Sequence, residues 1–592
     1  MPSPLEDALP EPISATGAHW KILKKPSANA LAKLGDLPEV VAQLLYLRGI
    51  KNKEEKDIFL EPDYARDLHD PLLLKGMPEG VELIRQAITD EKKIVVVGDY
   101  DVDGICGLTI LVGVLKDLGA KVGHYMPSRY RDGYGLTMRV AERLVDDGVD
   151  LIITVDNGIR SVDEVEYFKK QGKQVIVTDH HGIGPKLPPA DVVINPHQKG
   201  DRYPNKHLAG AAVGFKLATA LLRAYKSPED AEKEEKWLLD LVALATVADM
   251  MSLTGENRAL VHYGLKVLEK TKRLGLKKLI ELTRSPRDED QSPTAETIGW
   301  RLGPRLNAAG RLADANTAYQ LLMADNDADA QNLLTEIERL NVMRQEWTER
   351  IRKAVQQQIG NISDDKKIII ASDTGWPHGV LGIVAGRLTE EYQRPVILLD
   401  EEREFATGSA RSIESFDITA ALDKHADLLE RFGGHAAAAG LTLETAKIGE
   451  FREEIEKYAG KILKDHDFKR ALMIDAEITA KDFTLEVFEA IQKLQPFGED
   501  NLEPVFILKN AEVKDLQTMG DEGQHWRAQV KQKDGPLIKV IGFCLSDACA
   551  HVKVGDMIDV AGRLTSNTWN DQTTIEFKIE DVKFSQKYDR KT

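Results

Sequence analysis

The chain has 592 residues, too many for one hydrophobic core, and at about 100–200 residues per domain this length predicts three to five domains. Its 42% apolar and 30% charged residues are typical of a soluble globular protein, and it contains no apolar run long enough for a transmembrane helix. A net charge of −17 argues against a simple nucleic-acid coat protein, although a local basic groove and bound metals still allow a nucleic-acid enzyme.

The first residues lack the basic region and apolar core of a signal peptide. Cys106, Cys544 and Cys549 are too few and too scattered for a disulfide framework or a zinc cluster. Both observations predict a cytoplasmic protein without a membrane partner.

In chain order, residues 1–75 are expected to form an N-terminal extension with a helix at 39–48. From residue 76 onward, strands and helices alternate. The apolar runs predict strands at 94–97, 122–125, 150–155 and 174–178, and helices at 81–89, 105–118 and 137–147. This alternation favours a parallel, doubly wound sheet.

Acidic residues follow the first of these strands. Asp99, Asp101 and Asp103 alternate directly after it, about 6–7 Å apart if the backbone stays extended, and such anions repel one another without a cation. A solvated Asp-rich turn is the simpler alternative. An EF-hand is excluded, because Ile110 stands where that loop needs Glu and a strand precedes it.

Two further strands end in the same way. Asp156 follows the strand at 150–155, and Asp179, His180 and His181 follow the strand at 174–178. Open α/β sheets bind ligands at this edge. Asp249 ends another apolar run, although a helix cap or a buried ion pair explains it equally well, and His180 taken alone suits a satisfied buried histidine.

Asp99, Asp101, Asp103, Asp156, His180 and Asp249 together offer mostly oxygen ligands, which suit Mn²⁺ or Mg²⁺ better than zinc. Six ligands exceed the need of one catalytic ion. Two ions about 3.5–4 Å apart, bridged by one carboxylate, would use them all, and such sites serve phosphoester hydrolysis.

The motifs GDYDVDG at 98–104, VDNG at 155–158, TDHHG at 178–182 and ATVADM at 245–250 resemble those of the DHH phosphoesterase superfamily in order and spacing. The resemblance implies that Asp99 and Asp101 bind one ion, that Asp103, His180 and Asp249 bind the other, and that Asp156 bridges them. It also implies that Asp179 supports the site and that His181 faces the substrate phosphate.

Within the superfamily, GYGL at 133–136, NPH at 195–197, GENR at 255–258 and GPRLNAAGRL at 303–312 resemble the RecJ family of bacterial exonucleases specific for single-stranded DNA. The resemblance implies a DHH catalytic domain at 76–324 and a DHHA1 substrate-binding domain at 361–465. It also implies a 5′→3′ polarity, release of 5′-mononucleotides, and roles in DNA repair and recombination. The implied partners are single-strand-binding protein and a RecQ-type helicase, and we expect a monomer.

The segment at 325–360 is rich in Gln, Glu, Leu and Arg, which predicts a long connecting helix. Beyond it, strands at 367–371 and 394–399 begin a second α/β unit. The RecJ resemblance implies that substrate contacts come from both α/β domains: Arg129, Arg305, Asn307, Arg311, Ser409, Arg411, Gly433, Gly434 and His435. Tight packing is the alternative for the glycines. Pro377 separates Trp376 from His378, a departure from the family pattern that leaves His378 without an assigned role.

At 468–585, short strands separated by turns predict a small barrel that resembles an OB-fold. Such barrels bind single strands with basic and aromatic side chains, and the candidates here are Trp526, Arg527, Lys539, Arg563 and Trp569. The expected function is therefore single-strand DNA exonuclease. The alternatives are a DHH phosphodiesterase of short oligonucleotides or cyclic dinucleotides and an inactive DNA-binding scaffold.

Overall fold

The computed structural model describes residues 14–129, 131–133, 135–284, 292–360, 362, 365–402, 404–533, 535–569 and 572–585. These residues fall into two compact units, one drawn from 62–464 and 496–501 and the other from 1–61, 465–495 and 502–592. Among the described residues, no helix is both long enough and apolar enough to span a membrane.

The larger unit begins with a five-stranded, all-parallel sheet in the order β3-β2-β4-β5-β6. These strands comprise Val122–Tyr125, Ile94–Gly98, Leu151–Val155, Gln174–Thr178 and Val192–Ile194. The first four lie where the apolar runs predict strands, and β6 is an addition. The predicted parallel sheet is confirmed.

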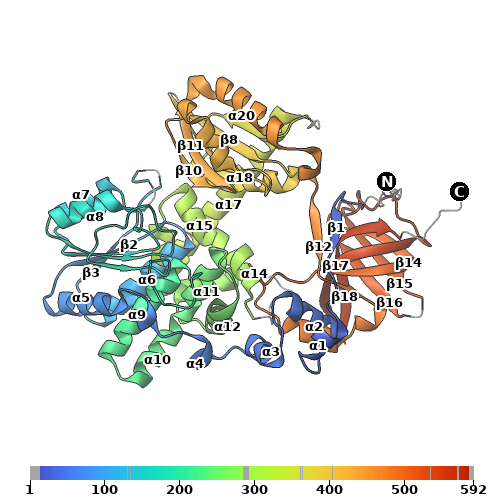
Figure 1. Ribbon diagram of the computed structural model, residues 1–592, viewed down its shortest axis with the longest axis horizontal. Coiled ribbons are helices and arrows are strands. Elements are labelled where there is room, and N and C mark those ends of the chain that lie inside the picture. The colour runs from blue at the N-terminus through green and yellow to red at the C-terminus, as the bar shows by residue number, and fades with distance from the viewer. Residues whose placement is uncertain are drawn as a thin grey trace, which may run out of the picture. The chain divides into compact units, whose positions relative to one another are not determined.

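Helices cover both faces of this sheet because its strands are apolar on both sides. Val96 and Ile153 pack with α5 (Met77–Thr89), α6 (Val102–Asp117) and α9 (Gly210–Tyr225), whereas Val95 and Ile152 pack with α7 (Met138–Asp146) and α8 (Val162–Lys170). Figure 1 shows these two groups of helices on opposite sides of the strands. The remaining helices of this part are α4 (Tyr64–Asp67), α10 (Pro228–Trp237), α11 (Leu239–Ala248), α12 (Gly255–Glu269), α13 (Leu274–Thr283), α14 (Ala295–Thr297), α15 (Gly303–Leu312) and α16 (Asn316–Met323).

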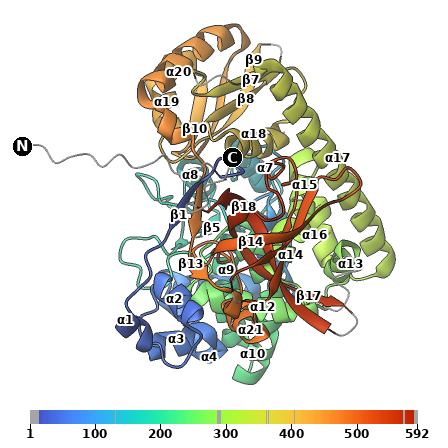
Figure 2. The ribbon, with the colours of Figure 1, turned by 90° about the vertical axis from the view of Figure 1, so that its right-hand side faces the viewer.

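The predicted connecting helix is present as α17, Asp327–Ile359, and Figure 2 shows it as one continuous helix. It leads to a mixed sheet in the order β10-β11-β9-β8-β7, the core of a second α/β part. The elements of this part are β7 (Ile369–Asp373), α18 (His378–Tyr392), β8 (Val396–Glu402), β9 (Phe405–Arg411), α19 (Ile418–Lys424), β10 (Arg431–His435), β11 (Ala438–Glu444) and α20 (Ile448–Ile462).

The smaller unit contains the predicted barrel. Five strands follow one another as a sheet that closes through an additional pairing of β14 with β17, which is the OB-fold arrangement. They are β14 (Phe506–Met519), β15 (His525–Lys531), β16 (Leu537–Gly542), β17 (Met557–Trp569) and β18 (Gln572–Phe584), and β13 (Ala476–Ile478) extends the sheet beside β14. Helix α21 (Leu485–Gln492) completes this region.

The N-terminal residues also belong to the barrel unit. Strand β1 (His19–Ile22) pairs in parallel with β12 (Ala471–Ile474), and the Trp20 indole donates a hydrogen bond to the buried Asp581 carboxylate at 2.8 Å. Helices α1 (Ala28–Ala32), α2 (Glu39–Leu47) and α3 (Lys53–Leu60) follow. Apolar packing of Trp20 against Ile474 and Ile507 explains why this segment folds with the end of the chain.

Candidate metal centre

The first group of acids lies where β2 ends and α6 begins. Asp101 is the N-cap of α6, and its carboxylate accepts a hydrogen bond from the Gly104 amide at 3.1 Å. Asp99 and Asp103 are each only 2% exposed. A Cβ on Gly104 would lie 2.4 Å from the Asp99 amide nitrogen, so glycine permits this tight strand-to-helix connection.

Helix α9 holds Asp103 in place. The backbone amides of Gly210 and Ala211, in its first turn, each donate a 2.7 Å hydrogen bond to one oxygen of the Asp103 carboxylate. The positive end of the helix stabilises the negative charge. No polar side chain marks Gly210 in the sequence, which explains why pattern reasoning missed this support.

Asp156 follows β4 with φ of 63°, in the left-handed region. A Cβ on Gly210 would lie 2.5 Å from the Asp156 Cβ and 2.6 Å from its Oδ1, so only glycine fits against this carboxylate. The neighbouring Asn157 amide donates to the Val97 and Val155 carbonyls, which ties the turn to β2 and β4. Asn157 is a second support that residue chemistry alone does not single out.

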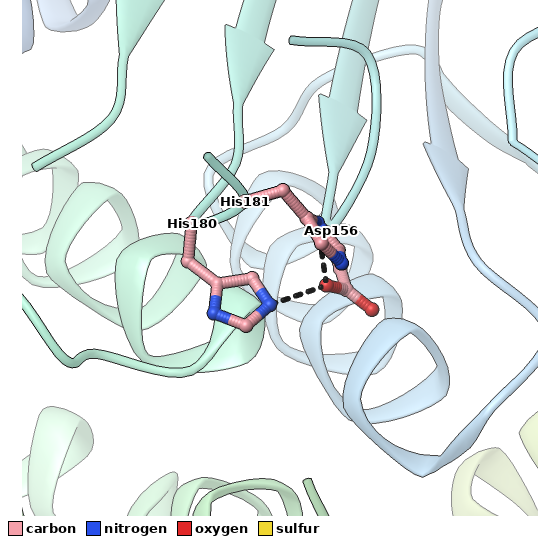
Figure 3. A group of neighbouring side chains, drawn as sticks. All are labelled: Asp156, His180 and His181. Carbon is pink, nitrogen blue, oxygen red and sulfur yellow. Dashed lines mark ion pairs between the residues drawn. The ribbon is translucent and has the colours of Figure 1, made fainter. Parts of the chain in front are cut away.

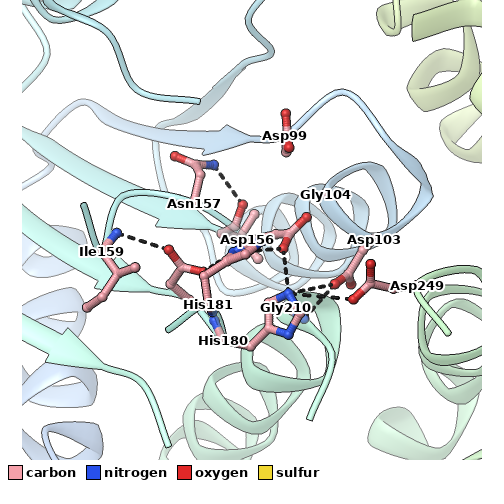
Figure 4. Close-up of polar contacts among 12 residues, drawn as sticks. Asp99, Asp103, Gly104, Asp156, Asn157, Ile159, His180, His181, Gly210 and Asp249 are labelled. Carbon is pink, nitrogen blue, oxygen red and sulfur yellow. Dashed lines mark hydrogen bonds and ion pairs between the residues drawn. The ribbon is translucent and has the colours of Figure 1, made fainter. Parts of the chain in front are cut away.

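The Asp179 carboxylate accepts hydrogen bonds from its own turn and from the loop after β4. One carboxylate oxygen accepts from the His180 amide at 2.7 Å, the His181 amide at 3.1 Å and the His181 Nδ1 at 2.8 Å. The other oxygen accepts from the Ile159 amide at 2.9 Å, the bond drawn from Ile159 in Figure 4. Although burial opposes ionisation, these bonds and the charge of His181 hold the Asp179 pKa below its ordinary value. Asp179 therefore orients the histidines.

Both histidine rings turn toward the same Asp156 oxygen (Figure 3). His180 Nε2 lies 3.2 Å from Asp156 Oδ1, and His181 Nδ1 lies 3.9 Å from it. His180 Nε2 is also 3.7 Å from Asp103 and 3.6 Å from Asp249, which ends α11. The structure thus gathers residues from three strand ends and one helix end.

The donor atoms suit divalent cations. Asp99, Asp101 and Asp156 present oxygens within 4.8 Å of one another, as do the ligand atoms of Asp103, His180 and Asp249; a third set, Asp156, His180 and His181, overlaps both. Asp156 Oδ1 and His180 Nε2 are buried without a hydrogen-bond partner among the described residues. Buried polar atoms that lack partners are expected where an ion binds.

The acids also raise one another's pKa. Burial and the neighbouring Asp101 raise the pKa of Asp99 to about 8, and burial with Asp103 and Asp101 raises that of Asp249 to about 8. The pKa of Asp156 is also raised well above its ordinary value, through burial and the charges of Asp103 and Asp101. Without cations, this site therefore retains protons at neutral pH.

The predicted substrate residues on α15 support the acid loop. Asn307 accepts a hydrogen bond from the Val102 amide at 3.1 Å, so its side chain positions the start of α6. A Cβ on Gly310 would lie 2.3 Å from the Tyr100 carbonyl oxygen, which shows how closely α15 approaches this loop. The Arg129 guanidinium lies 4.1 Å from the centre of the Tyr100 ring.

The two arginines of α15, Arg305 and Arg311, differ in their surroundings. Arg305 makes a bidentate ion pair with Glu338 of α17, with distances of 2.7 and 3.3 Å, so the Glu338 carboxylate already neutralises its charge. Arg311 donates to the Gly379 carbonyl at 3.0 Å, at the start of α18. Burial and the positive charge of Arg129 lower the Arg311 pKa to about 10.

Ser409 and Arg411 lie together on β9. Arg411 Nη1 donates to Ser409 Oγ at 3.2 Å and to the Ala410 carbonyl at 2.8 Å. A Cβ on Gly382 of α18 would lie 2.8 Å from Arg411 Nη2 and 3.1 Å from Ser409 Oγ. The Ser409 and Arg411 side chains therefore lie close to the backbone of α18 at Gly382.

Gly433, Gly434 and His435 lie on β10, an edge strand that pairs with β11. Gly434 has φ of 155°, and a Cβ there would lie 2.2 Å from the Ala438 carbonyl oxygen, so this glycine has a packing role. A Cβ on Gly433 would meet no atom within 4 Å, and His435 is exposed. These two remain available to a ligand.

His378, whose role the sequence leaves open, contacts two carboxylates. Its Nε2 lies 3.0 Å from Asp400 and 3.3 Å from Glu402. Asp400 also accepts from the Trp376 amide at 3.0 Å. His378, the first residue of α18, thus links the start of this helix to β8.

Comparisons with known proteins match each part of the chain. The model of the DHH family N-terminal domain matches residues 93–246, that of the DHHA1 domain matches 365–461, and that of the RecJ OB domain matches 474–581. The single-stranded-DNA-specific exonuclease RecJ of Bacillus subtilis is 35% identical over 97% of this chain and 72% of its own length. The chain belongs to the RecJ family.

Two further RecJ proteins extend the comparison. The RecJ of Dickeya dadantii is 33% identical over 95% of this chain and 98% of its own length. A crystal structure of Thermus thermophilus RecJ in complex with Mn²⁺ superposes with a TM-score of 0.82 at 31% identity, and covers 95% of this chain and 79% of that one. RecJ from the same organism has also been solved with Mg²⁺.

Most of the aromatic and basic candidates on the RecJ barrel are engaged by the barrel itself. Trp526 is 2% exposed and lies in the interior, Arg563 pairs with Glu580 and Glu503, and Lys539 lies 3.4 Å from Glu576. Arg527 is partly exposed. The Trp569 side chain lies outside the described part.

Proposed function

We propose that this RecJ-family chain is a metal-dependent exonuclease that hydrolyses phosphodiester bonds of single-stranded DNA in the 5′→3′ direction and releases 5′-mononucleotides, in DNA repair and recombination. The observation that carries the proposal is that Asp156 belongs to two potential ligand sets, one with Asp99 and Asp101 and one with His180 and His181. Its Oδ1 is buried without a hydrogen-bond partner among the described residues. Its relatives in Bacillus subtilis and Dickeya dadantii, which are named single-stranded-DNA-specific exonucleases, supply the substrate class.

In this proposal two Mn²⁺ or Mg²⁺ ions occupy the site. Asp99 and Asp101 would hold one ion, Asp103, His180 and Asp249 would hold the other, and Asp156 would contact both. When bound, such ions supply positive charge beside the phosphate and lower the pKa of a nearby water. The metal-bound crystal structures of RecJ relatives support this choice of ions.

His181 would act on the phosphate. The Asp179 carboxylate holds the His181 ring through Nδ1 and raises its pKa to about 9 although burial opposes this, so the ring carries a proton at neutral pH. A protonated ring beside the scissile phosphate would offset its charge and can assist the departing oxygen. Asp179 would serve as the positioning residue.

The positive groups around the site would recognise the strand. Ser409 and Arg411 would bind a terminal 5′-phosphate, with Arg129, Arg311 and Asn307 on the side of the acid loop. Arg305 would act through its pairing with Glu338, and Gly433, Gly434 and His435 would contact the backbone. The OB-fold barrel supports a polymeric substrate, because a small substrate needs no module that follows a strand.

A cleavage assay tests this proposal. The protein is incubated with Mn²⁺ and with 5′- or 3′-labelled single strands, a duplex, and a cyclic dinucleotide. We expect mononucleotides from the 5′ end of single strands only. Cleavage of the cyclic dinucleotide alone would overturn the exonuclease proposal in favour of a small-substrate phosphodiesterase, and no cleavage at all would favour an inactive DNA-binding scaffold.

Family membership further suggests a cytoplasmic monomer that works with single-strand-binding protein and a RecQ-type helicase. Sedimentation of the purified protein tests the oligomeric state: a single species near the 65.9 kDa chain mass is expected. Pull-down with each purified partner tests the interactions, and absence of binding at micromolar concentrations would reject them.

A further inference from the structure

The buried face of α17 changes character in its middle. Its apolar residues from Leu334 to Leu340 join the core around the parallel sheet, and those from Ile351 to Val355 join the core of the second α/β part. Between them Asn341, Arg344 and Thr348 are 0%, 7% and 1% exposed. Polar side chains are seldom buried in this way without hydrogen-bond partners, so buried residues of this kind are candidates for a binding role.

Two of these side chains carry hydrogen-bond donors without acceptors. Arg344 Nη2 donates to Asn341 Oδ1 at 3.0 Å, which uses the amide's acceptor. Arg344 Nε and Asn341 Nδ2 have no partner among the residues that the structure describes. Thr348 is satisfied, since its hydroxyl donates to the Arg344 carbonyl at 2.7 Å. The unmet groups are all donors, so the missing partner is an acceptor.

The surroundings are positively charged. Burial and the charges of Arg387 and Arg305 lower the pKa of Arg344, and Arg344 in turn contributes to the lowered pKa of Arg311. Within the described ranges, no carboxylate forms an ion pair with Arg344, whereas Arg305 is matched by Glu338. An acceptor that also carries negative charge therefore fits better than a neutral one.

Helix α15 connects this stretch to the metal centre. Its Arg305 donates to Glu338 of α17 at 2.7 Å, and its Asn307 accepts from the Val102 amide at the start of α6, beside the acid loop. We propose that Asn341 and Arg344 form a subsite for an internal backbone phosphate of the single-stranded substrate, in addition to the terminal-phosphate contacts of Ser409 and Arg411. The inference rests on the proposed exonuclease function.

Binding is measured with the full-length protein in EDTA, by fluorescence anisotropy of labelled single-stranded oligonucleotides. Arg344→Gln should weaken binding about tenfold, because a charge-assisted hydrogen bond is lost. The slope of log affinity against log salt should become shallower by about 0.7, the value for one phosphate contact on a single strand. The loss should be equal for strands with a 5′-phosphate and with a 5′-hydroxyl.

Oligonucleotides with one methylphosphonate linkage locate the contact. Each removes a single backbone charge, so the wild type should lose affinity at several positions. Arg344→Gln should become insensitive at one of these positions and stay sensitive at the others. Arg339→Gln is the matched control: Arg339 lies on the same helix with a side chain 57% exposed and pairs with Glu336, so it should behave as the wild type.

Asn341→Asp separates binding from folding. It places a carboxylate where Asn341 Oδ1 already accepts from Arg344, so it should raise the thermal midpoint or leave it unchanged while weakening DNA binding. A purely structural role would lower stability and leave the salt slope and the methylphosphonate profile unchanged, which would overturn the proposal in favour of a buried water. Failure of the wild type to bind single strands would instead overturn the proposed function.

Discussion

His180 Nε2 lies 3.2 Å from Asp156 Oδ1, and the two residues follow neighbouring parallel strands. Val155 at the end of β4 is in register with Thr178 at the end of β5, so the next residues of both strands meet at one edge. Neither Asp156 Oδ1 nor His180 Nε2 has a hydrogen-bond partner among the described residues. The contact therefore lies at the centre of the proposed metal site.

Asp156→Asn should abolish cleavage while leaving the fold intact. The amide keeps the shape but removes the charge of the residue proposed to contact both ions, so we expect activity to fall at least about a thousandfold, which is about 4 kcal/mol of activation free energy. In EDTA the thermal midpoint should not fall, because burial already disfavours the ionised form. Substantial residual activity with Mn²⁺ would remove Asp156 from its bridging role.

Stability without metal should depend on pH in the acid-to-neutral range. Asp99 and Asp249 have pKa values of about 8 in the folded chain and about 4 when unfolded. Between these values the folded state holds more protons, so the free energy of unfolding should decrease as pH rises from about 4 to about 8. Thermal unfolding in EDTA checks this.

Mn²⁺ should reverse that trend, since binding displaces the retained protons. Calorimetric titration at pH 7 in two buffers of different ionisation enthalpy should detect proton release. Identical pH profiles of stability in EDTA and in Mn²⁺ would contradict this account of the acids.

Gly210→Ala should disrupt the metal centre. The added Cβ would lie 2.5 Å from the Asp156 Cβ, so the carboxylate or the start of α9 must shift. We expect loss of Mn²⁺-induced thermal stabilisation and of activity. Gly113→Ala is the control, because a Cβ there meets nothing within 4 Å and the change should stabilise α6 by up to about 1 kcal/mol. Equal behaviour of both variants would contradict the steric argument.

Asp179→Asn should lower activity about 10- to 100-fold, the usual effect of losing a group that orients metal ligands. The amide can no longer accept from every donor that now surrounds the carboxylate, and the His181 pKa should fall from about 9, as measured by NMR titration. Asp191→Asn is the control. Asp191 directly precedes β6, and its carboxylate accepts from the Val175 amide near the start of β5, the end opposite to Asp179. This substitution should leave the His181 titration unchanged; a matching shift would point to a general loss of structure.

Trp20→Phe should destabilise the barrel unit. The indole donates to Asp581, which is 1% exposed, so the change leaves a buried carboxylate short of one donor. We expect a loss of about 1.5–3 kcal/mol in the free energy of unfolding, measured by chemical denaturation. Lys21→Ala on the same strand should have little effect, and an equal loss there would mean that the strand pairing, not the indole, is responsible.

The parallel strands could be predicted from the sequence more completely than the strands of the barrel. The parallel strands are short, continuous apolar runs, so Ile94–Gly98 and Gln174–Thr178 are apparent from the residues alone. The barrel strands are longer than their apolar runs suggest: β14 extends to Met519, beyond an irregularity between Val513 and Asp515 that breaks the alternation. Pairing with neighbours, which acts over long sequence distances, decides such lengths.

The sequence by itself determined the chemistry of this protein: aspartates and histidines directly after buried strands, in a superfamily's order, specify the family and a hard-metal site. Only the tertiary structure decided which side chains are already engaged, as Arg305 is by Glu338, and which lack partners, as Arg344 Nε does among the described residues. It also assigned the N-terminal strand to the barrel unit. The reason is physical: local sequence determines residue type and strand propensity, whereas partners and burial depend on segments hundreds of residues away.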